Sequence, residues 1–397
     1  MSNEELFLNK LGQTNQFPYL IEVERAEGIY IYDKNGKAYM DMIAGVAVNN
    51  IGNRHPKVVE AIKNQVDKYL HVMVYGEFIQ DSNIAFAQNL TSLLPDSLNC
   101  VYPVNSGTEA IEAALKLAKR VTGRTEIVSF RGSYHGSTHG ALSVSGNEIK
   151  KIAYRPLLPD VRFIKLNEFT DLDQITAKTA GVILETVQGD AGVRISNSEF
   201  LKALRERCDE VGALLIFDEI QCGMGRAGKM FAFEHSGVIP DMLTLGKALG
   251  GGMPIGALVS SKANLHEFTY NPMLGHITTF GGHPVVTAAA NAFLDVMKTE
   301  IDFEEVERKG QLLVDLLKVD SEIIEIRRIG MMFAFDMKSF ERVEKVVKRN
   351  LELGLISFWF LSHPYSFRLS PPLNITEAEI RKAAGIILQA IRETKEI

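Results

Sequence analysis

The middle of the chain alternates between short apolar runs and segments with helical periodicity, and this alternation restricts the fold more than any other feature. The clearest apolar runs cover 126–130, 180–186 and 213–220, and the clearest helical patterns cover 56–70, 108–121 and 198–212. Continuous apolar runs that end in polar residues are typical of parallel strands buried on both faces. We therefore predict an α/β unit whose helices connect the strands of a mostly parallel central sheet.

The two ends of the chain follow a different pattern. Near the N-terminus, the turn sequence at 33–36 (DKNG) separates two strand-like runs and indicates a hairpin. From Asp302 on, the pattern predicts in order a helix at 304–317, one strand-like run at 323–336, a helix at 341–353 and a closing helix from Thr376. This order of elements is typical of an α+β module rather than of a continued α/β repeat.

The length of 397 residues allows two or three domains. We expect an N-terminal segment at 1–50 that joins the small domain, a large α/β domain at 51–300 and a small α+β domain at 301–397. No stretch rich in proline, glycine or serine marks the boundary near residue 300. The two domains are therefore expected to be joined without a flexible linker.

Composition and charge exclude several classes of protein. Hydrophobic residues make up 46% of the chain, which is enough for a large buried core. Lysine and arginine total 43 against 49 aspartates and glutamates, so the net charge of −6 disfavours a nucleic-acid or anionic-membrane partner. No apolar run reaches the roughly 18–20 residues of a membrane span.

The N-terminus and the cysteines indicate the compartment. The first residues lack the charged and then apolar pattern of a signal peptide. The three cysteines, Cys100, Cys208 and Cys222, are far apart and form no CxxC pair. A disulfide framework and a cysteine zinc site are both disfavoured, and we predict a cytoplasmic protein.

Two short motifs resemble functional sites but lack the required context. Residues 223–228 (GMGRAG) match the GxGxxG pattern of dinucleotide-binding turns. The following sequence is interrupted at Gly237 and Pro240 before a long helix can form, so a glycine-rich loop is favoured. His135 and His139 have the spacing of a zinc helix, but no glutamate follows the first histidine. We predict no metal site.

Two other features are suited to binding an anion and a cation. Ser106, Gly107 and Thr108 open a predicted helix, where free N–H groups attract anions such as phosphate. On that helix, Glu112 and Lys116 have the spacing of a supporting ion pair. Asp218 ends a buried strand, the position at which α/β sheets bind ligands. A carboxylate with apolar surroundings needs a cationic partner, and a protonated ring nitrogen is one.

A lysine and an arginine are two further candidate ligand-binding residues. Lys247 lies between an apolar run and several glycines, a setting that removes water from the amine, lowers its pKa and makes it a nucleophile toward aldehydes. Arg368 lies in a short strand-like run before two prolines and offers a fork for a substrate carboxylate. Each feature alone is also explained by a cap, a loop or a surface residue. Together they are the parts that pyridoxal phosphate (PLP) needs from a protein.

Over nearly its whole length the sequence resembles the class III PLP-dependent aminotransferases, the family of acetylornithine, ornithine and 4-aminobutyrate aminotransferases. The signature run is 214–257, from "LLIFDEIQCG" to "GGGMPIGA". Five further runs match the motifs of this family in order: "VNSGTEAIEAALKLAKR", "FRGSYHGST", "ILETVQGDAG", "TTFGGHP" and "FRLSPPL". The resemblance implies the fold type I of PLP-dependent transferases, and PLP as the cofactor.

The resemblance also implies roles for individual residues in a homodimer with shared active sites. Lys247 is expected to form the Schiff base with the cofactor and to move the proton, while Asp218 pairs with the pyridinium nitrogen. Other residues implied to bind the cofactor are Ser106, Gly107 and Thr108 at the phosphate, the partner subunit's Thr279 at the same phosphate, Tyr134 stacked on the ring, Gln221 near the ring hydroxyl, and Glu185, which begins the "ETVQ" element. Arg368 is implied to bind the α-carboxylate of glutamate or 2-oxoglutarate.

Several residues depart from the pattern of the family. The acidic residue that pairs with Arg368 when an ω-amine donor is bound is usually glutamate, but it is Asp190 here. Thr186 replaces the usual proline of the "EPxQ" element. Ser137 stands where the family's "HGRT" places an arginine against the carboxylate of the donor, and Val46 fills the position of a tyrosine found in ornithine aminotransferases. Another cation could replace the missing arginine, and Arg54 is one candidate.

We expect an aminotransferase that moves an amino group from an acetylornithine-like or ornithine-like ω-amino donor to a 2-oxo acid such as 2-oxoglutarate. Because losing a charged hydrogen bond costs about 1.5–3 kcal/mol, Ser137 leaves a β-amino acid or a simple amine open as the donor. A related PLP enzyme, such as an aminomutase or a decarboxylase, is a second alternative. A regulator without turnover and a nicotinamide-dependent oxidoreductase are less well supported by the motifs.

Overall fold

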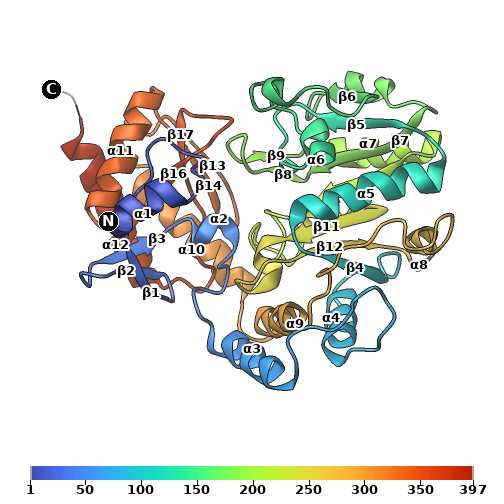
Figure 1. Ribbon diagram of the computed structural model, residues 1–397. Coiled ribbons are helices and arrows are strands. Elements are labelled where there is room, and N and C mark those ends of the chain that lie inside the picture. The colour runs from blue at the N-terminus through green and yellow to red at the C-terminus, as the bar shows by residue number, and fades with distance from the viewer. Residues whose placement is uncertain (1, 396–397) are drawn as a thin grey trace.

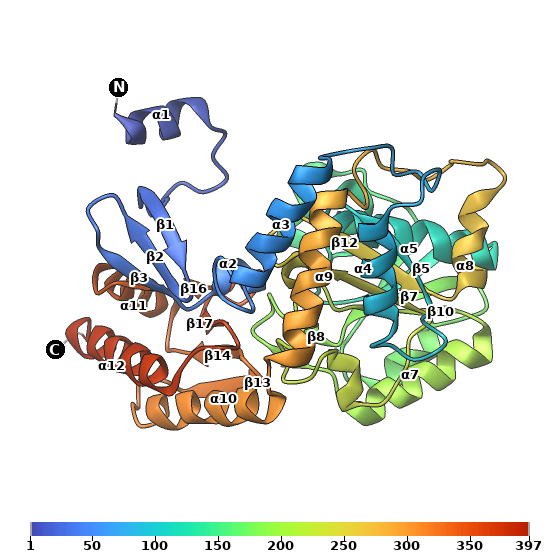
Figure 2. The same ribbon diagram turned by 90° about the horizontal axis from the view of Figure 1, so that it is seen from below.

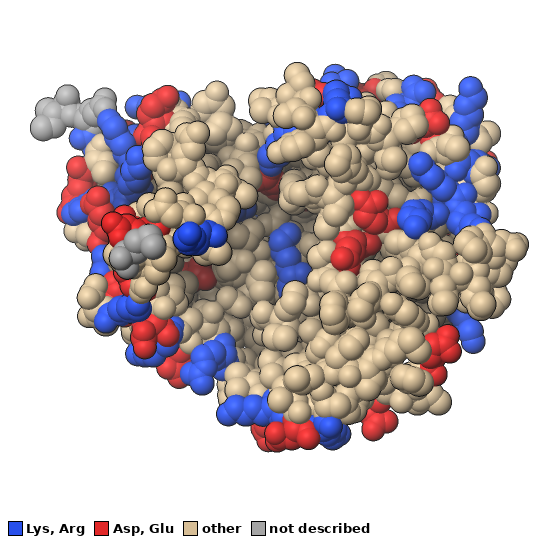
Figure 3. All heavy atoms as spheres, in the orientation of Figure 1, with Lys and Arg blue, Asp and Glu red and all other residues tan. Residues whose placement is uncertain are grey.

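The computed structural model describes residues 2–395, which form two halves with a hollow between them (Figures 1 and 3). One half is built on a seven-stranded sheet, and the other contains two four-stranded sheets. Among the helices of residues 2–395, none combines the length and the apolar character needed to cross a bilayer. The predicted domain limits at residues 50 and 300 stay a prediction.

The seven-stranded sheet forms the framework of the larger half. Its strands, in spatial order, are β4 (Cys100–Val104), β12 (Gly256–Ser260), β11 (Met242–Gly246), β10 (Leu214–Asp218), β7 (Thr179–Glu185), β5 (Glu126–Phe130) and β6 (Val161–Ile164). Only β12 runs antiparallel to its neighbours in this sheet. The predicted mostly parallel sheet is confirmed, and the carboxyl ends of β4, β5, β7, β10 and β11 meet at one edge.

Helices cover both faces of this sheet, which explains its continuous apolar strands. On one face, α5 (Gly107–Thr122) packs against residues such as Ile183 and Ile216. On the other face, neighbouring strand residues such as Val182 and Leu215 belong to the core that also contains side chains of further helices. The helices on that side are α4 (Asp81–Thr91), α7 (Ser198–Val211) and α9 (Pro284–Thr299), and α3 (Pro56–Lys68) packs beside α9 (Figure 2).

The smaller half joins the two ends of the chain. Its first sheet has the order β1 (Val23–Glu27), β2 (Tyr30–Asp33), β3 (Ala38–Asp41) and β15 (Leu355–Ile356). The predicted hairpin is present, because β2 and β3 pair antiparallel. The parallel pairing of Leu355 with Met40 attaches the N-terminal strands to the C-terminal part of the chain. The short α1 (Asn3–Lys10) extends away from this sheet (Figure 2).

The second sheet of the smaller half corrects one prediction. The run at 323–336 is not one strand but a hairpin of β13 (Glu325–Ile329) and β14 (Met332–Asp336). Gly330 and Met331 form the turn. Gly330 has a φ of +52°, and a Cβ at this position would lie 2.2 Å from the backbone nitrogen of Gly228. The sheet continues through β17 (Ser366–Leu369) to β16 (Phe358–Trp359).

Three helices cover the strands of the smaller half. They are α10 (Phe303–Leu317), α11 (Phe340–Glu352) and α12 (Glu377–Glu393), each within one residue of the predicted position where one was given. Thr376 caps α12, because its hydroxyl accepts a hydrogen bond from the backbone nitrogen of Glu379. This capping explains why the last helix begins where the sequence changes.

The glycine-rich run at 223–228 is a loop, as the sequence favoured. The helical segment that follows it is only a 3₁₀ turn at Ala232–His235. Arg226 in this loop is fully buried and donates hydrogen bonds to the carbonyl oxygens of Met331 (3.1 Å) and Pro371 (2.5 Å) and to the side chain of Asn50. The loop therefore fastens the two halves to each other.

Candidate active site

The candidate site lies at the edge where the parallel strands end. Asp218 is the last residue of β10 and is paired in register with Glu185, the last residue of β7. Lys247 immediately follows β11, the strand on the other side of β10. Three of the residues predicted from separate motifs are therefore neighbours at one sheet edge, the place where α/β folds bind their ligands.

Asp218 is buried and held by two hydrogen bonds. Its Oδ2 lies 2.7 Å from Nδ1 of His135, and its Oδ1 accepts a hydrogen bond from the backbone nitrogen of Ile220 at 3.0 Å. Because a carboxylate only accepts hydrogen bonds, the Nδ1 of His135 carries the proton in this contact. The arrangement fixes one carboxylate oxygen against the imidazole and orients the whole group.

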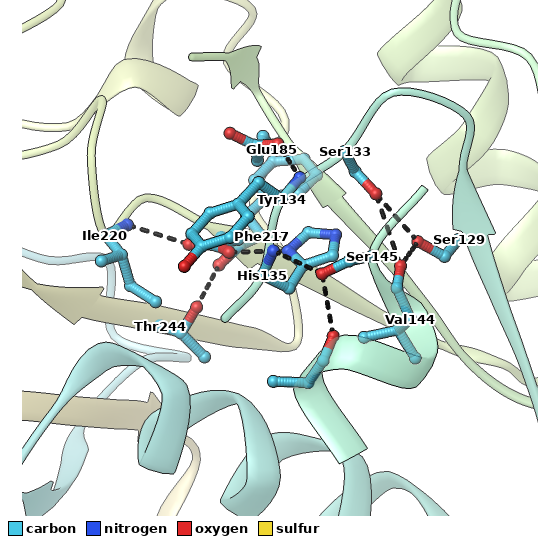
Figure 4. Close-up of polar contacts among 12 residues, drawn as sticks. Ser129, Ser133, Tyr134, His135, Val144, Ser145, Glu185, Phe217, Ile220 and Thr244 are labelled. Carbon is cyan, nitrogen blue, oxygen red and sulfur yellow. Dashed lines mark hydrogen bonds and ion pairs between the residues drawn. The ribbon is translucent and has the colours of Figure 1, made fainter. Parts of the chain in front are cut away.

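His135 is a site residue that the sequence analysis missed, because it considered this histidine only as a metal ligand. The ring is buried, and its Nε2 has no hydrogen-bond partner within residues 2–395. The backbone nitrogen of His135 donates to Ser145 Oγ at 3.0 Å (Figure 4). A histidine in the loop directly after β5 lies at the same sheet edge as Asp218, and that position is the signal that could have identified it.

Lys247 has an unusual backbone and an amine without a partner. Its φ of +45° lies in the left-handed region, which is rare for a residue other than glycine and marks functional positions. The amine has no hydrogen bond or ion pair with any described residue. Burial lowers the pKa of Lys247, although the negative charges of Asp218 and Glu185 act in the opposite direction. A lysine in this environment has a larger neutral, nucleophilic fraction.

The start of α5 has the form predicted for an anion site. Ser106 caps the helix, and its Oγ accepts from the backbone nitrogen of Glu109 at 3.4 Å. A Cβ on Gly107 would lie 2.8 Å from the side chain of Ile220, so only glycine allows this close approach to the loop after β10. The amides of Gly107 and Thr108 have no acceptor in the described part of the chain and remain available to an anion.

The expected ion pair on α5 is wrong. Glu112 instead accepts hydrogen bonds from the hydroxyl of Thr138 (2.6 Å) and the backbone nitrogen of Gly140 (2.8 Å), while Lys116 lies 2.9 Å from Nδ1 of His276. Thr138 also lies 2.7 Å from Oγ1 of Thr108. Glu112 therefore anchors the loop after β5 to the helix that carries the predicted phosphate site.

Glu185 and Gln221 border the same region. The carboxylate oxygens of Glu185 accept from the backbone nitrogens of Tyr134 (2.8 Å) and Gly189 (3.0 Å). Burial, together with the charge of Asp218, raises the pKa of Glu185 to about 7. Gln221 packs so closely on Gly189 that a Cβ there would lie 1.7 Å from its Oε1. These contacts hold the loop of Tyr134 against the end of β7.

Thr186, which replaces the usual proline, has a defined role in the packing. Its Oγ1 lies 3.3 Å from Oε1 of Glu219 and 3.3 Å from Sγ of Cys222. Both neighbours are buried in the loop after β10. The substitution therefore adds a link between the ends of β7 and β10.

Arg368 and Asp190 lie at the smaller-half side of the site, but they do not contact each other. The Nε of Arg368 is buried, and the guanidinium makes no hydrogen bond or ion pair within residues 2–395. Its carbon Cζ lies 5.4 Å from the ring centroid of Phe358 and 5.8 Å from that of Phe360. Asp190 instead accepts from Lys150 Nζ at 2.6 Å. Burial would raise the pKa of Asp190, but the hydrogen bond and charge of Lys150 outweigh it and hold the pKa low.

The remaining predicted residues are more exposed. Tyr134 and Ser137 are linked by their hydroxyls at 3.3 Å. Val46 lies in a short left-handed turn, α2 (Ala44–Ala47), with φ +66°, which is strained for a β-branched residue. Thr279 is exposed on the segment between β12 and α9. Arg54 is exposed as well and lines a surface hollow with Glu60 and Lys63.

The residues of this site fit PLP, an aldehyde cofactor with a phosphate and a basic ring nitrogen. The amine of Lys247 has no partner within the described chain, two helix amides are free, and a buried carboxylate is held in place by His135. Each of these groups matches one part of the cofactor. The fold and the site therefore define a PLP-dependent enzyme of the α/β class.

Comparisons with known proteins identify the family. The family model of the class III aminotransferases matches residues 11–391. Acetylornithine aminotransferase from Methanopyrus kandleri is 38% identical over 95% of each chain. Adenosylmethionine-8-amino-7-oxononanoate aminotransferase from Methanocaldococcus jannaschii superimposes with a TM-score of 0.92 at 27% identity, over 99% of each chain. This chain belongs to the class III aminotransferases.

A further solved structure bears on the cofactor. Ornithine aminotransferase from Toxoplasma gondii, described with partial occupancy of PLP at its active site, superimposes with a TM-score of 0.91 at 28% identity, over 98% of this chain and 93% of its own. The expected fold type I and the PLP-dependent transaminase class are confirmed. The roles of the individual site residues stay predictions.

Proposed function

We propose that this enzyme transfers the amino group of an acetylornithine-like or ornithine-like ω-amino donor to a 2-oxo acid such as 2-oxoglutarate. The observation that carries the proposal is that neither the amine of Lys247 nor the guanidinium of Arg368 has a protein partner in the described chain, so one is available to an aldehyde and the other to a carboxylate. The names of the relatives, an acetylornithine and an ornithine aminotransferase, support this donor class.

When bound, PLP supplies an electron sink for the bond to the reacting carbon. Lys247 would hold the cofactor through its Nζ, and the same amine would carry the proton of the donor carbon. Asp218, oriented by His135, would keep a ring nitrogen protonated through its negative charge. The free amides of Gly107 and Thr108 would bind the phosphate, and Tyr134 would contact the ring from the loop after β5.

Arg368 binds the carboxylate of the 2-oxo acid in this proposal. Its Nε is buried and its guanidinium has no protein partner in the described chain, so a bidentate carboxylate would satisfy it. Arginine keeps its charge even where burial lowers its pKa. An arginine in this state binds a carboxylate more strongly than one that must first leave a salt bridge.

The proposal includes a homodimer in the cytoplasm. Apolar side chains are exposed around the segment of Thr279; they are Met73, Phe78, Ile79, Met273, Leu274, Ile277 and Phe280. Figure 3 shows few charged side chains over the area of α4 and α8 (Lys262–His266). Such a surface favours burial against a second copy. The three cysteines are free, which suits a reducing compartment.

A screen of amino donors tests the proposed substrate class. The PLP-loaded protein is mixed separately with acetylornithine, ornithine, 4-aminobutyrate, β-alanine and a simple amine, and the visible absorption of the bound cofactor is followed. We expect acetylornithine or ornithine to remove this absorption, and 2-oxoglutarate to restore it.

Ser137 favours the second candidate, a transaminase for a β-amino acid or an amine, because the side chain that should face a donor carboxylate carries no charge. Loss of absorption with β-alanine or the simple amine alone would overturn the proposed donor and support this candidate. Turnover without any oxo acid would instead indicate an aminomutase or a decarboxylase.

A further inference from the structure

Three donors from both halves of the protein contact the carboxylate of Asp190. Its Oδ2 accepts from Lys150 Nζ (2.6 Å) and from Ser362 Oγ (2.7 Å), and its Oδ1 accepts from the backbone nitrogen of Leu361 (3.2 Å). The side chain of Asp190 is only 10% exposed, so these hydrogen bonds are little weakened by water. Asp190 is therefore fixed between the two halves.

Lys150 reaches Asp190 from a well-anchored segment at the mouth of the site. It ends the 3₁₀ turn Glu148–Lys150, and the preceding Asn147 donates from Nδ2 to Ser362 Oγ at 2.9 Å. The Nζ of Lys150 also lies 5.1 Å from the ring centroid of Tyr134. Lys150 thus connects the loop of Tyr134 with Asp190.

The ion pair between Lys150 and Asp190 affects Arg368. The Cζ of Arg368 lies 5.8 Å from the ring centroid of Phe360, and the next residue, Leu361, donates its backbone nitrogen to Asp190. The charged groups of Arg368 and Asp190 are therefore close together, although no contact joins them. Arg368 is half-buried and its guanidinium is unpaired, and a free carboxylate nearby would normally pair with such a group. The ion pair between Lys150 and Asp190 keeps Asp190 from competing with a substrate carboxylate for Arg368.

We infer that Lys150 is a specificity-determining residue that holds Asp190 away from Arg368 and so keeps Arg368 free for a substrate carboxylate. This inference rests on the proposed function. Its consequence is tighter binding of glutamate and 2-oxoglutarate, whose carboxylate lies beside the reacting carbon. The ω-amino donor reacts at a carbon without a neighbouring carboxylate, so the arrangement acts on the half-reaction with the 2-oxo acid.

A double-mutant cycle tests this role by binding rather than turnover. Glutarate, a dicarboxylate without an amino or oxo group, is titrated into the PLP-loaded protein by calorimetry. In the protein that keeps Asp190, Lys150→Met frees this carboxylate to pair with Arg368. Glutarate should then bind about tenfold or more weakly, which is in the range of coupling energies measured between residues in contact. In the Asp190→Asn background, the same change should weaken binding less than about threefold, because no competing carboxylate remains.

Three further variants complete the design. Lys150→Arg keeps a cation beside Asp190 and should restore nearly wild-type affinity. Glu148→Gln lies on the same turn, in an exposed ion pair with Arg155, and should change nothing. Lys150→Gln replaces Lys150→Met if the methionine variant does not fold.

In a separate assay, Lys150→Met should lower the rate with glutamate relative to the rate with a simple amine.

An equal loss of affinity with and without the Asp190→Asn change would overturn the inference, because Lys150 would then contact the ligand itself. An unchanged affinity in Lys150→Met would overturn it as well. A wild-type protein that binds no glutarate would also contradict it, since there would be no carboxylate site to keep free. The donor screen decides the proposed function independently of these outcomes.

Discussion

Replacing Lys247 by alanine is expected to abolish amino transfer and the covalent bond to PLP. The amine of Lys247 has no partner in the described chain, and burial lowers its pKa. These surroundings favour a reactive neutral amine and provide no contact that would stabilise the fold. Loss of both the nucleophile and the proton carrier should reduce turnover by at least about 10³-fold, since general acid–base catalysis alone contributes about 10²–10⁴-fold. Steady-state rates and the mass of the borohydride-reduced protein measure the two losses.

Lys178→Ala is the matched control, because Lys178 is exposed on a loop before β7. This variant should keep both the rate and the mass increase of one bound cofactor after reduction. Substantial turnover by Lys247→Ala would contradict the assignment of Lys247. So would a reduced protein in which the cofactor is attached to another lysine.

The second large effect is expected for Asp218→Asn. The change keeps the shape of the side chain but removes the charge that holds a ring nitrogen protonated, and it alters the contact with Nδ1 of His135. Because preorganised charges often contribute about 10²–10³-fold to a rate, we expect kcat to fall by about this amount. Stopped-flow kinetics of the half-reaction with the best donor separates this loss from weaker substrate binding.

Asp209→Asn provides the control for Asp218→Asn. Asp209 is exposed on α7 and pairs with Arg205. This helix leads into the start of β10, whereas Asp218 is at the end of that strand. A normal kcat in Asp218→Asn would show that the buried carboxylate does not act on the cofactor ring. An equal loss in Asp209→Asn would show a general effect on the fold instead.

Local patterns were sufficient to predict the elements that form the site. The apolar runs that became β7 and β10 end at Glu185 and Asp218, and their parallel pairing follows from burial on both faces. The helix from Gly107 begins at its predicted cap. The pairing of Leu355 with Met40 was expected only as a joining of the chain ends, because a register between distant segments leaves no local trace.

Contacts between distant polar residues were beyond prediction. The contact of His135 with Asp218 joins residues 83 positions apart, and Lys150 meets Asp190 across 40 positions. The hairpin at Gly330 was also missed, because β13 and β14 read as one strand-like run, and the two-residue turn of Gly330 and Met331 contains only one glycine to mark it. Such contacts depend on how loops pack once the sheet has formed.

The transfer of ¹⁵N from a labelled donor to 2-oxoglutarate tests the central claim most directly. The PLP-loaded wild-type protein is incubated with ω-¹⁵N-labelled acetylornithine or ornithine and 2-oxoglutarate, and the glutamate formed is analysed by mass spectrometry. We predict ¹⁵N-glutamate in equal amount to the donor consumed, and none with Lys247→Ala. Consumption of the donor without labelled glutamate, or no reaction with any amino donor of the screen, would contradict an aminotransferase.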